Sequence, residues 1–387
     1  MEPKIQNKYT LIDVEETWQQ LLPLTFVRNI SEIRIGILTL KEKWEHSLKQ
    51  SVLLNFCVDY LKMNQEHPTE ILINSSVIPT PDLVTAIVNL PKNTTLVHNG
   101  VFVASNQATD SSSIIEFKGL FHKLNYPWEI FLFNDRELRS DFDLLTKNRT
   151  SQPLDASNKT LGSQIFIEEG AKVQCAILNS TSGPIYIAKD AEVMEGSIIR
   201  GPFSLGEYSQ TKMGTKIYGA TTIGPHCKVG GEIGNSIFFG YSNKAHDGYL
   251  GNSIIGEWCN LGADTNSSNL KNNYSKVDVY SYAQTGYVST GEQFCGLIMG
   301  DYSKCGINTM FNTGTVVGVC ANIFGGGFPS KHIPSFSWCS VENNVLYQLD
   351  KAIETIKTVY QRRGLELDER TISILTNIYN TNSENVF

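Results

Sequence analysis

The feature that most constrains the fold is a six-residue step between apolar residues in the second half of the chain. The step is clearest in two runs, which are Ile217, Ile223 and Val229, and Met299, Cys305, Phe311, Val317 and Ile323. Neither an α-helix nor an isolated strand repeats with this period. The step predicts a left-handed parallel β-helix over residues 160–340, in which three hexapeptides form a triangular coil and the apolar residue points inward.

Two irregularities interrupt the step. Leu250 and Ile255 are five residues apart, and between Leu261 and Met299 the step is lost. Residues 264–296 are polar and too irregular for coils, so we expect a loop that leaves the coil at one corner. Long loops on a rigid scaffold commonly carry function, which makes this stretch a candidate binding region.

The first part of the chain, residues 1–150, has the pattern of an α/β domain. Strand-like runs are expected at residues 33–40, 70–74 and 95–104, and helix-like runs at residues 41–48, 51–63 and 82–90. Strands and helices in alternation predict a parallel sheet covered by helices. Residues 140–160 lose the apolar periodicity and gather Asp, Ser, Asn and Thr, which predicts a linker before the β-helix.

Helical spacing returns near the end of the chain. Leu346, Leu349, Ile353 and Ile356 would lie on one face of a helix. We predict C-terminal helices over residues 341–387 that cap the open end of the coil, where a sheet edge would otherwise be exposed.

Composition narrows the possible partners. The chain contains no apolar run of the roughly 18 residues that a transmembrane helix needs, and its charged N-terminus is unlike a signal peptide, so we expect a cytoplasmic protein without a membrane partner. A formal net charge of −7 argues against nucleic-acid binding. The eight cysteines show no CxxC spacing, so no metal site is expected.

The stretch KAHDGYLGNSIIGEWCNLGADTNSSN carries a specific motif within the repeat. Its matching positions are His246, Tyr249, Leu250-Gly251, Ile255-Gly256, Asn260–Ala263 and Asn269. In these residues the chain resembles the acetyltransferase half of the bifunctional N-acetylglucosamine-1-phosphate uridylyltransferase/glucosamine-1-phosphate N-acetyltransferase family. The resemblance covers about residues 200–335. In the N-terminal part, Leu22-Pro23-Leu24-Thr25 and Leu72-Ile73-Asn74 resemble segments of sugar-phosphate nucleotidyltransferases. The chain is therefore identified as a variant of the family with a shortened nucleotidyltransferase-like domain at residues 1–150, which we call the head.

This resemblance implies roles for individual residues. His246 would be the general base that accepts the proton of the attacking amine. Tyr249 and Asn269 would hold the sugar, and backbone N–H groups at the glycine-rich corners would stabilise the thioester oxyanion. Ala263 would lie along the acetyl-CoA channel, and Lys331 would contact the phosphates of CoA. The implied protein is a homotrimer that acetylates an amino-sugar phosphate on the route to UDP-N-acetylglucosamine.

One departure from the family concerns the phosphate of the acceptor. Tyr218 and Asn235 stand where counting back through the repeat places the two basic residues of the family. A phosphate without cationic partners binds poorly. Either Lys216, Lys228 or Lys244 takes over this task, or the acceptor is not glucosamine 1-phosphate.

The head departs further from the family pattern. Arg28, Arg34 and Asn74 are the candidate nucleotide-binding residues, but the glycine-rich phosphate loop is missing. Ser75-Ser76 also replace the Gly-Asp that would hold Mg²⁺. Mg²⁺ and UTP are therefore expected as partners only if the head is active.

Two rival hypotheses remain. The protein could be a sugar-1-phosphate nucleotidyltransferase whose β-helix only drives oligomerisation, or a non-catalytic assembly or regulatory protein. A zinc carbonic anhydrase is disfavoured, because His226 and His246 lack a third histidine at coil spacing.

Overall fold

The computed structural model describes residues 9–62, 70–106 and 113–386 of the 387-residue chain. Its residues form two compact units, which are described separately. The first comprises residues 1–21, 28–33 and 38–126, and the second comprises residues 22–27, 34–37 and 127–387.

The first unit is built on one six-stranded sheet with the order β2-β1-β3-β5-β4-β6. Its strands are β1 (Tyr9–Ile12), β2 (Leu53–Asn55), β3 (Ile71–Asn74), β4 (Thr94–His98), β5 (Val101–Asn106) and β6 (Ser113–Glu116). Its helices are α1 (Glu15–Gln20), α2 (Leu40–Leu48) and α3 (Pro81–Val88), with 3₁₀ turns η1 (Ile30–Glu32) and η2 (Asp59–Leu61). Every strand pairing is parallel except the two made by β5. The expected α/β class is confirmed, with one antiparallel strand inside the sheet.

Three local predictions for this part of the chain are wrong. Residues 33–40 form no strand, because Gly36 turns the chain at φ +74° and its N–H donates to the Asn134 side chain of α4 (Glu129–Thr146). Residues 51–62 form β2 and η2 instead of a helix, while residue 63 lies outside the described residues. Residues 95–104 form the β4–β5 hairpin, whose Asn99-Gly100 turn has positive φ at both positions, a strong hairpin signal.

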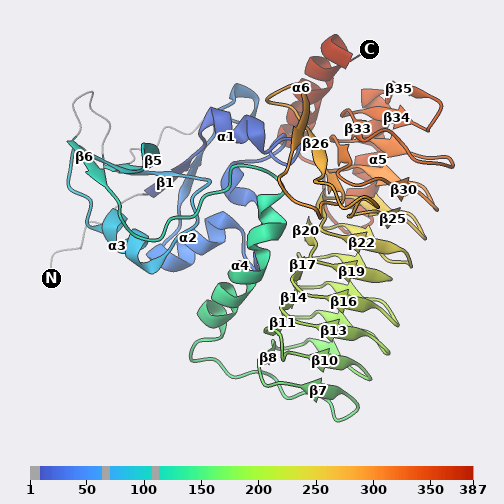
Figure 1. The fold of residues 1–387 in the computed structure, drawn as a ribbon, viewed down its shortest axis with the longest axis horizontal. Coiled ribbons are helices and arrows are strands. Elements are labelled where there is room, and N and C mark those ends of the chain that lie inside the picture. The colour runs from blue at the N-terminus through green and yellow to red at the C-terminus, as the bar shows by residue number, and fades with distance from the viewer. Residues whose placement is uncertain (1–8, 63–69, 107–112, 387) are drawn as a thin grey trace. The chain divides into compact units, whose positions relative to one another are not determined.

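The second unit is a parallel β-helix made of three sheets (Figure 1). Sheet 1 contains β7 (Lys159–Leu161), β10 (Ile177–Asn179), β13 (Ile198–Arg200), β16 (Lys216–Tyr218), β19 (Glu232–Gly234), β22 (Tyr249–Gly251), β25 (Asn266–Ser267) and β30 (Met310–Phe311). Sheet 2 contains β8 (Ile165–Ile167), β11 (Ile185–Ile187), β14 (Phe203–Leu205), β17 (Thr221–Ile223), β20 (Ile237–Gly240), β23 (Ile254–Glu257), β28 (Ile298–Met299), β31 (Val316–Val317) and β33 (His332–Ile333). Sheet 3 contains β9 (Lys172–Val173), β12 (Glu192–Val193), β15 (Gln210–Thr211), β18 (Lys228–Val229), β21 (Asn243–Lys244), β24 (Asn260–Leu261), β29 (Lys304–Cys305), β32 (Asn322–Ile323), β34 (Ser337–Cys339) and the antiparallel β35 (Asn344–Leu346).

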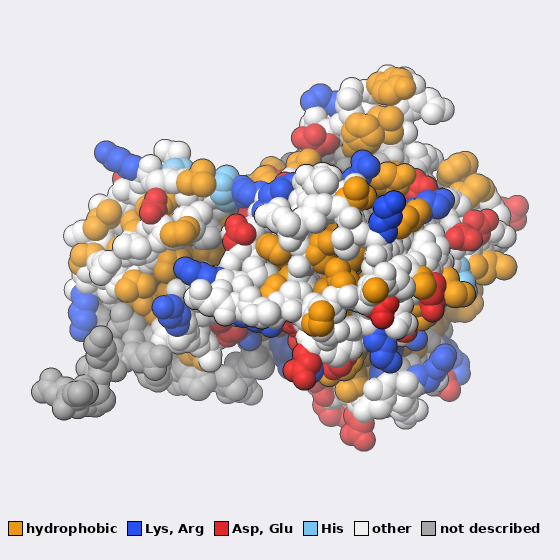
Figure 2. Space-filling view, turned by 90° about the horizontal axis from the view of Figure 1, so that it is seen from below, with side chains coloured by type: hydrophobic (Ala, Val, Ile, Leu, Met, Phe, Trp, Pro, Cys, Tyr) orange, Lys and Arg blue, Asp and Glu red, His pale blue; other side chains and the backbone are white. Residues whose placement is uncertain are grey.

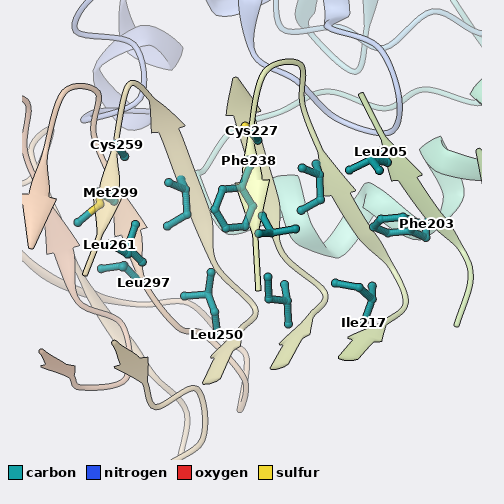
Figure 3. Close-up of a cluster of buried hydrophobic side chains, with 14 of the residues drawn as sticks. Phe203, Leu205, Ile217, Cys227, Phe238, Leu250, Cys259, Leu261, Leu297 and Met299 are labelled. Atoms are coloured by element: carbon teal, nitrogen blue, oxygen red, sulfur yellow. The ribbon is translucent and has the colours of Figure 1, made fainter. Parts of the chain in front are cut away.

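The inward apolar residues of the repeat form one continuous core. Phe203, Phe238, Leu250, Leu261 and Met299 are all buried and stack along the coil axis (Figure 3). Apolar burial of this kind is the main stabilising contribution in a solenoid, since each coil covers the inner face of its neighbour. The predicted hexapeptide β-helix is confirmed.

The coils shorten around the motif that carries His246. Regular coils place residues 18 apart in register, such as Phe203 and Thr221. From β18 to β21 the step is 15 residues, from Lys228 to Asn243, and from β21 to β24 it is 17, from Asn243 to Asn260. The five-residue slip in the sequence belongs to this shortened region.

The polar stretch between β25 and β28 departs from the prediction in two ways. It begins after Ser267, because Asn266 and Ser267 still pair with the next coil. It also contains an ordered hairpin, β26 (Asp278–Ser281) with β27 (Gly286–Ser289), where an irregular loop was expected. The coil continues across the insertion, because β23 pairs with β28 and β24 pairs with β29.

The C-terminal helices are α5 (Leu349–Gln361) and α6 (Glu369–Val386). Helix α6 contacts the last coil, where Tyr379 packs edge-on against Phe336. Helix α5 lies instead along one corner of the coil. There Tyr360 stacks on Trp258, at the end of a ladder of rings that is completed by Tyr208, His226 and Tyr241.

Replacing Gly248 by Ala is expected to lower the free energy of unfolding by about 1–3 kcal/mol. Gly248 has φ +112°, and a Cβ there would lie 2.2 Å from the carbonyl oxygen of Thr265 on the next coil. Gly214→Ala is the matched control, because Gly214 also has positive φ but open space around it. Urea unfolding of both variants measures the difference. Equal losses would show that the close approach between coils contributes nothing.

Candidate functional site

The strongest candidate site is an open groove of about 850 Å³ at the corner between sheets 3 and 1. Its lining residues come from five successive coils and are Met194, Lys212, Met213, Gly230, Gly231, Ala245, His246, Asp247, Ala263 and Asp264. The imidazole of His246 is exposed in this groove. The structure therefore brings together His246 and Ala263, two residues that the motif assigned to acetyl transfer.

Small residues in the preceding coil allow the His246 corner to pack closely. A Cβ on Gly230 would lie 2.6 Å from the carbonyl oxygen of Ala245. Gly231 has φ +78°, and a Cβ there would lie 2.6 Å from the carbonyl oxygen of Gly248. The glycines thus set the backbone position of the corner.

Lys244 lies inside the coil beneath His246. Its side chain is fully buried, and its ammonium donates to the carbonyl oxygens of His246 (3.0 Å), Asp247 (3.1 Å) and Gly230 (3.3 Å). Burial lowers the pKa of Lys244 to about 8, against the opposing effect of nearby carboxylates. The expected contact of Lys244 with a substrate phosphate is not found, because the ammonium points into the coil and away from the groove.

Some residues that line the groove have backbone N–H groups without an acceptor in the described part of the chain. Among the described residues, no acceptor is found for the N–H of Ala245 or of Ala263. The glycines expected to supply such donors are used otherwise: Gly230 donates to the Lys244 carbonyl and Gly262 to the Cys305 carbonyl. Backbone N–H groups that face a reacting carbonyl can stabilise an oxyanion.

Lys212 is a cation of the groove that the sequence reasoning missed. It follows the inward residue Thr211, so its side chain points outward two coils before His246. Its ammonium donates to Gln210 at 2.9 Å. Counting back through ideal six-residue steps missed this residue because the intervening coil is shortened; the alternation of inward and outward residues would have found it.

Tyr249 and Asn269 form a cluster on the outer face of sheet 1. The amide of Asn269 donates to the Tyr249 hydroxyl at 3.0 Å and to Asn252 at 2.8 Å. Gly251 lies beneath them, where a Cβ would come within 2.2 Å of that hydroxyl. Burial raises the pKa of Tyr249, so the phenol stays neutral and can donate a hydrogen bond. The two residues expected to hold the sugar therefore contact each other, and Tyr249 follows His246 by three residues in the chain.

Lys216 and Tyr218 also lie on this outer face. Lys216 is in the same column as Tyr249, with Glu232 on the strand between them and 3.8 Å from the Lys216 ammonium. Tyr218 and Asn235 line a different hollow of about 480 Å³, together with the exposed Arg200. Lys216 and Arg200 are therefore cations of this face, Lys216 close to Tyr218 in the sequence and Arg200 at the hollow.

Lys331 anchors the inserted hairpin. Its ammonium donates to the Asp278 carbonyl of β26 at 2.8 Å and lies over the ring of Tyr287 of β27. Burial and the nearby Lys271 lower the pKa of Lys331. In this structure its contacts are with the hairpin, so any contact with CoA would be made at the hairpin base.

The three nucleotide-binding candidates of the head are engaged in local structure. The guanidinium of Arg34 donates to the carbonyls of Phe239 and Ile37, within the second unit. The Asn74 side chain donates to the Phe102 carbonyl and accepts from Ser76, which closes the turn after β3. Arg28 is buried. Arg28 and Asn74 belong to the first unit, whereas Arg34 belongs to the second.

Asp13 is the residue of the head that the sequence reasoning missed. It follows β1, next to the end of the parallel strand β3, where ligands of α/β sheets commonly bind. One carboxyl oxygen accepts from the Ile30 N–H (3.0 Å) and the Ser75 hydroxyl (2.6 Å), and the other is buried with no hydrogen-bond partner among the residues that the structure describes. Burial raises the pKa of Asp13 to about 7. A polar residue directly after a buried strand was the available signal.

No group of three or more His, Cys, Asp or Glu side chains gathers within ligand distance of one point in residues 9–62, 70–106 and 113–386. His226 lies in the ring ladder between Tyr208 and Tyr241, away from His246. At the position where the family pattern would hold Mg²⁺, the side chains of Asn74, Ser75 and Ser76 hydrogen-bond within the protein.

On the face in Figure 2, Lys and Arg side chains are interspersed with Asp and Glu side chains. None of the helices in the described part of the chain is both long and apolar enough to cross a bilayer.

The fold defines a protein with an α/β N-terminal domain and a hexapeptide β-helix. Residues 9–150 match the family model for sugar nucleotidyl transferases. The chain is 24% identical over 222 residues to a bifunctional sugar-1-phosphate nucleotidylyltransferase/acetyltransferase of Sulfurisphaera tokodaii, which covers 57% of this chain and 49% of the relative. It is 36% identical over 87 residues to the bifunctional protein GlmU of Methanococcus aeolicus, which covers 22% of this chain and 20% of the relative. These matches confirm the predicted resemblance to the bifunctional family.

The matched region spans about half of the first relative and a fifth of the second. Among solved structures, the chain is similar to the Arabidopsis UDP-N-acetylglucosamine acyltransferase, with 13% identity and a TM-score of 0.23 over 56% of this chain and 78% of that one. It is also similar to the polySia-specific acetyltransferase NeuO, with 13% identity and a TM-score of 0.27 over 50% of this chain and 86% of that one.

Proposed function

We propose that the β-helix transfers the acetyl group of acetyl-CoA to the amine of an amino-sugar phosphate resembling glucosamine 1-phosphate. The observation that carries this proposal is the exposed imidazole of His246 in a groove that also presents the free N–H groups of Ala245 and Ala263. A base beside two N–H donors suits acyl transfer. The bifunctional relative from Sulfurisphaera tokodaii, which is named for acetyl transfer as well, supports the assignment.

The proposed reaction is a balanced acyl transfer. The amine attacks the thioester carbonyl carbon and forms the C–N bond, while His246 takes a proton from the nitrogen. The N–H groups of Ala245 and Ala263 hold the resulting oxyanion. When the intermediate collapses, the C–S bond breaks, and the CoA thiolate takes the proton from the imidazolium, which restores His246.

The acceptor would lie across the corner, with its sugar against Tyr249 and Asn269 and its phosphate towards a cation. Lys212 is the cation that shares the groove with His246, and Lys216 is the cation on the Tyr249 side. An ammonium and a phosphate form strong charge-assisted hydrogen bonds. Two lysines on either side of the corner would thus fill the role that Tyr218 and Asn235 leave vacant.

The test is thiol release from acetyl-CoA in the presence of glucosamine 1-phosphate, with mass spectrometry of the N-acetylated product. Glucosamine without phosphate is the matched acceptor, and we expect it to react with a much higher KM. If no acceptor amine releases thiol above background, the acetyl-transfer assignment is overturned and an oligomerising or assembly role for the β-helix is favoured.

Lys212→Met is expected to raise the KM for the phosphorylated acceptor roughly 10- to 100-fold, the range for a lost charge-assisted contact. The kcat should change less, because the reacting atoms keep His246. Lys216→Met is the comparison, and its effect should be smaller because Glu232 already lies beside its ammonium. Steady-state kinetics with both acceptors decide the matter: an equal KM increase for unphosphorylated glucosamine would contradict a phosphate role.

Lys331, the hairpin and the oligomeric state complete the proposal. We propose that the CoA phosphates bind near the base of the hairpin that Lys331 anchors. We also propose that the protein is a homotrimer and lies in the cytoplasm. Light scattering on the purified chain tests the trimer, since a stable monomer or dimer would contradict it.

A second candidate function is nucleotidyl transfer by the head to give UDP-N-acetylglucosamine. It is favoured by the family match over residues 9–150 and by the unpartnered carboxyl oxygen of Asp13 at the end of β1. The assay measures pyrophosphate released from UTP or dTTP with a sugar 1-phosphate and Mg²⁺. We expect Asp13→Asn to abolish any release; release that survives this change would exclude Asp13 from the site.

A further inference from the structure

Lys244 occupies a position where every other coil carries an uncharged residue. The inward column of sheet 3 consists of Val173, Val193, Thr211, Val229, Lys244, Leu261, Cys305, Ile323 and Cys339. Lys244 is 0% exposed in this column. Desolvation of an ammonium is costly, so the repeat alone would favour Val or Leu here. A residue that breaks a local rule at a candidate site suggests a function for the exception.

The ammonium of Lys244 bonds only to the backbone around the groove. Its donors match three carbonyl oxygens: those of His246 and Asp247 in the corner itself, and that of Gly230 in the preceding coil. The lysine therefore ties the residue that carries the imidazole to the coil beneath it.

The hydrogen bonds of the Lys244 ammonium occur where the backbone hydrogen bonds between neighbouring coils are interrupted. At the equivalent position one coil earlier, the Gly230 N–H donates to the Lys244 carbonyl at 2.7 Å. The Ala245 N–H makes no such bond to an acceptor in the described residues. The corner at His246 thus lacks this hydrogen bond between neighbouring coils and has instead three hydrogen bonds from the buried Lys244 ammonium. The Ala245 N–H is therefore free to bind a ligand.

We infer that Lys244 is a positioning residue for His246: its ammonium holds the corner backbone so that the imidazole and the free Ala245 N–H keep a fixed relative placement. The inference rests on the proposed acetyl transfer. The groups facing the ammonium, Asp247, Asp264 and Cys305, include two carboxylates. A pKa of about 8 keeps the side chain mostly protonated at neutral pH.

Lys244→Leu restores the apolar residue of the repeat and removes the tie. We expect the variant to fold. Amide hydrogen exchange in peptides spanning residues 244–251 should be faster than in the parent protein. The kcat should fall at least 10-fold, while the KM for acetyl-CoA changes less than threefold. Lys304→Leu is the matched control. Lys304 is also largely buried with its ammonium on a carbonyl, that of Tyr302, but it lies outside the groove.

Hydrogen exchange and kinetics together decide the inference. Unchanged exchange at residues 244–251, or faster exchange with an unchanged kcat, overturns the positioning role, and so does an equal loss of kcat in Lys304→Leu. If the parent protein shows no acetyl transfer, the proposed function fails on its own, and the exchange data still decide whether Lys244 holds the corner. Should Lys244→Leu not fold, Lys244→Met, which keeps the length of the side chain, takes its place.

Discussion

His246→Ala is expected to lower kcat/KM for acetyl transfer roughly 10²- to 10⁴-fold, the usual contribution of a general base. This corresponds to about 3–5 kcal/mol of transition-state stabilisation. The loss should fall mainly on kcat, because the groove keeps Lys212, Ala263 and its other contacts with both substrates. Stopped assays of thiol release with saturating acetyl-CoA measure the effect. The folded state should be unaffected, because the imidazole is exposed and the corner is held by Lys244.

The control is a second histidine on another corner of the same coil region. His226 stacks between Tyr208 and Tyr241, so His226→Phe keeps the stacking while it removes the imidazole. Its acetyl-transfer rate should stay within about twofold of the parent, as for substitutions away from a site. A loss in this variant as large as in His246→Ala would mean that the effect is general instability and that His246 has no special role.

Phe238→Ala is the change expected to destabilise the β-helix most, by about 3–5 kcal/mol. The ring is fully buried among the inward residues of sheet 2, between Ile223 and Ile255 on the neighbouring strands. Its removal leaves a cavity that the stacked coils cannot close without shifting. Urea unfolding followed by far-UV circular dichroism measures the loss.

Ile198→Ala provides the contrast, because Ile198 points outward from sheet 1 and is 50% exposed. Its truncation should change the free energy of unfolding by about 0.5 kcal/mol or less. If both variants lose the same amount, inward burial is not what stabilises the coil, and the reading of the repeat is wrong.

The β-helix could be predicted from the sequence because its rule is local and repeated. Each inward residue, such as Phe311 or Val317, reports the same environment as the one six positions away, so a single misplaced residue does not obscure the pattern. The head offered no such redundancy. Residues 51–62 satisfied a helical spacing by chance, and the pairing of β2 with β1, a contact distant in sequence, decided their conformation.

The sequence predicted the residues of the candidate site that belong to the acetyltransferase motif, but it predicted the positions of the charged side chains less well. His246, Ala263, Tyr249 and Asn269 were found because the motif fixes them. Lys212 was missed because the second coil after it, from β18 to β21, has 15 residues in place of 18, which only the strand register reveals. Lys244 was placed with the substrate because a sequence does not show that a charged residue points inward.

The ring ladder has a consequence for how the solenoid comes apart. Trp258 and Tyr302 lie on coils that are adjacent in space but separated by the inserted hairpin in sequence. Pairing these two coils requires the closure of a long loop, which costs conformational entropy. Because each coil of a solenoid contacts only its neighbours, the stack should separate most readily at this junction. Tyr360 spans the junction, since its ring stacks on Trp258 and its hydroxyl lies 3.1 Å from that of Tyr302. Helix α5 therefore links the coils on either side of the hairpin. These coils should unfold in one cooperative transition only while Tyr360 keeps its contacts with Trp258 and Tyr302.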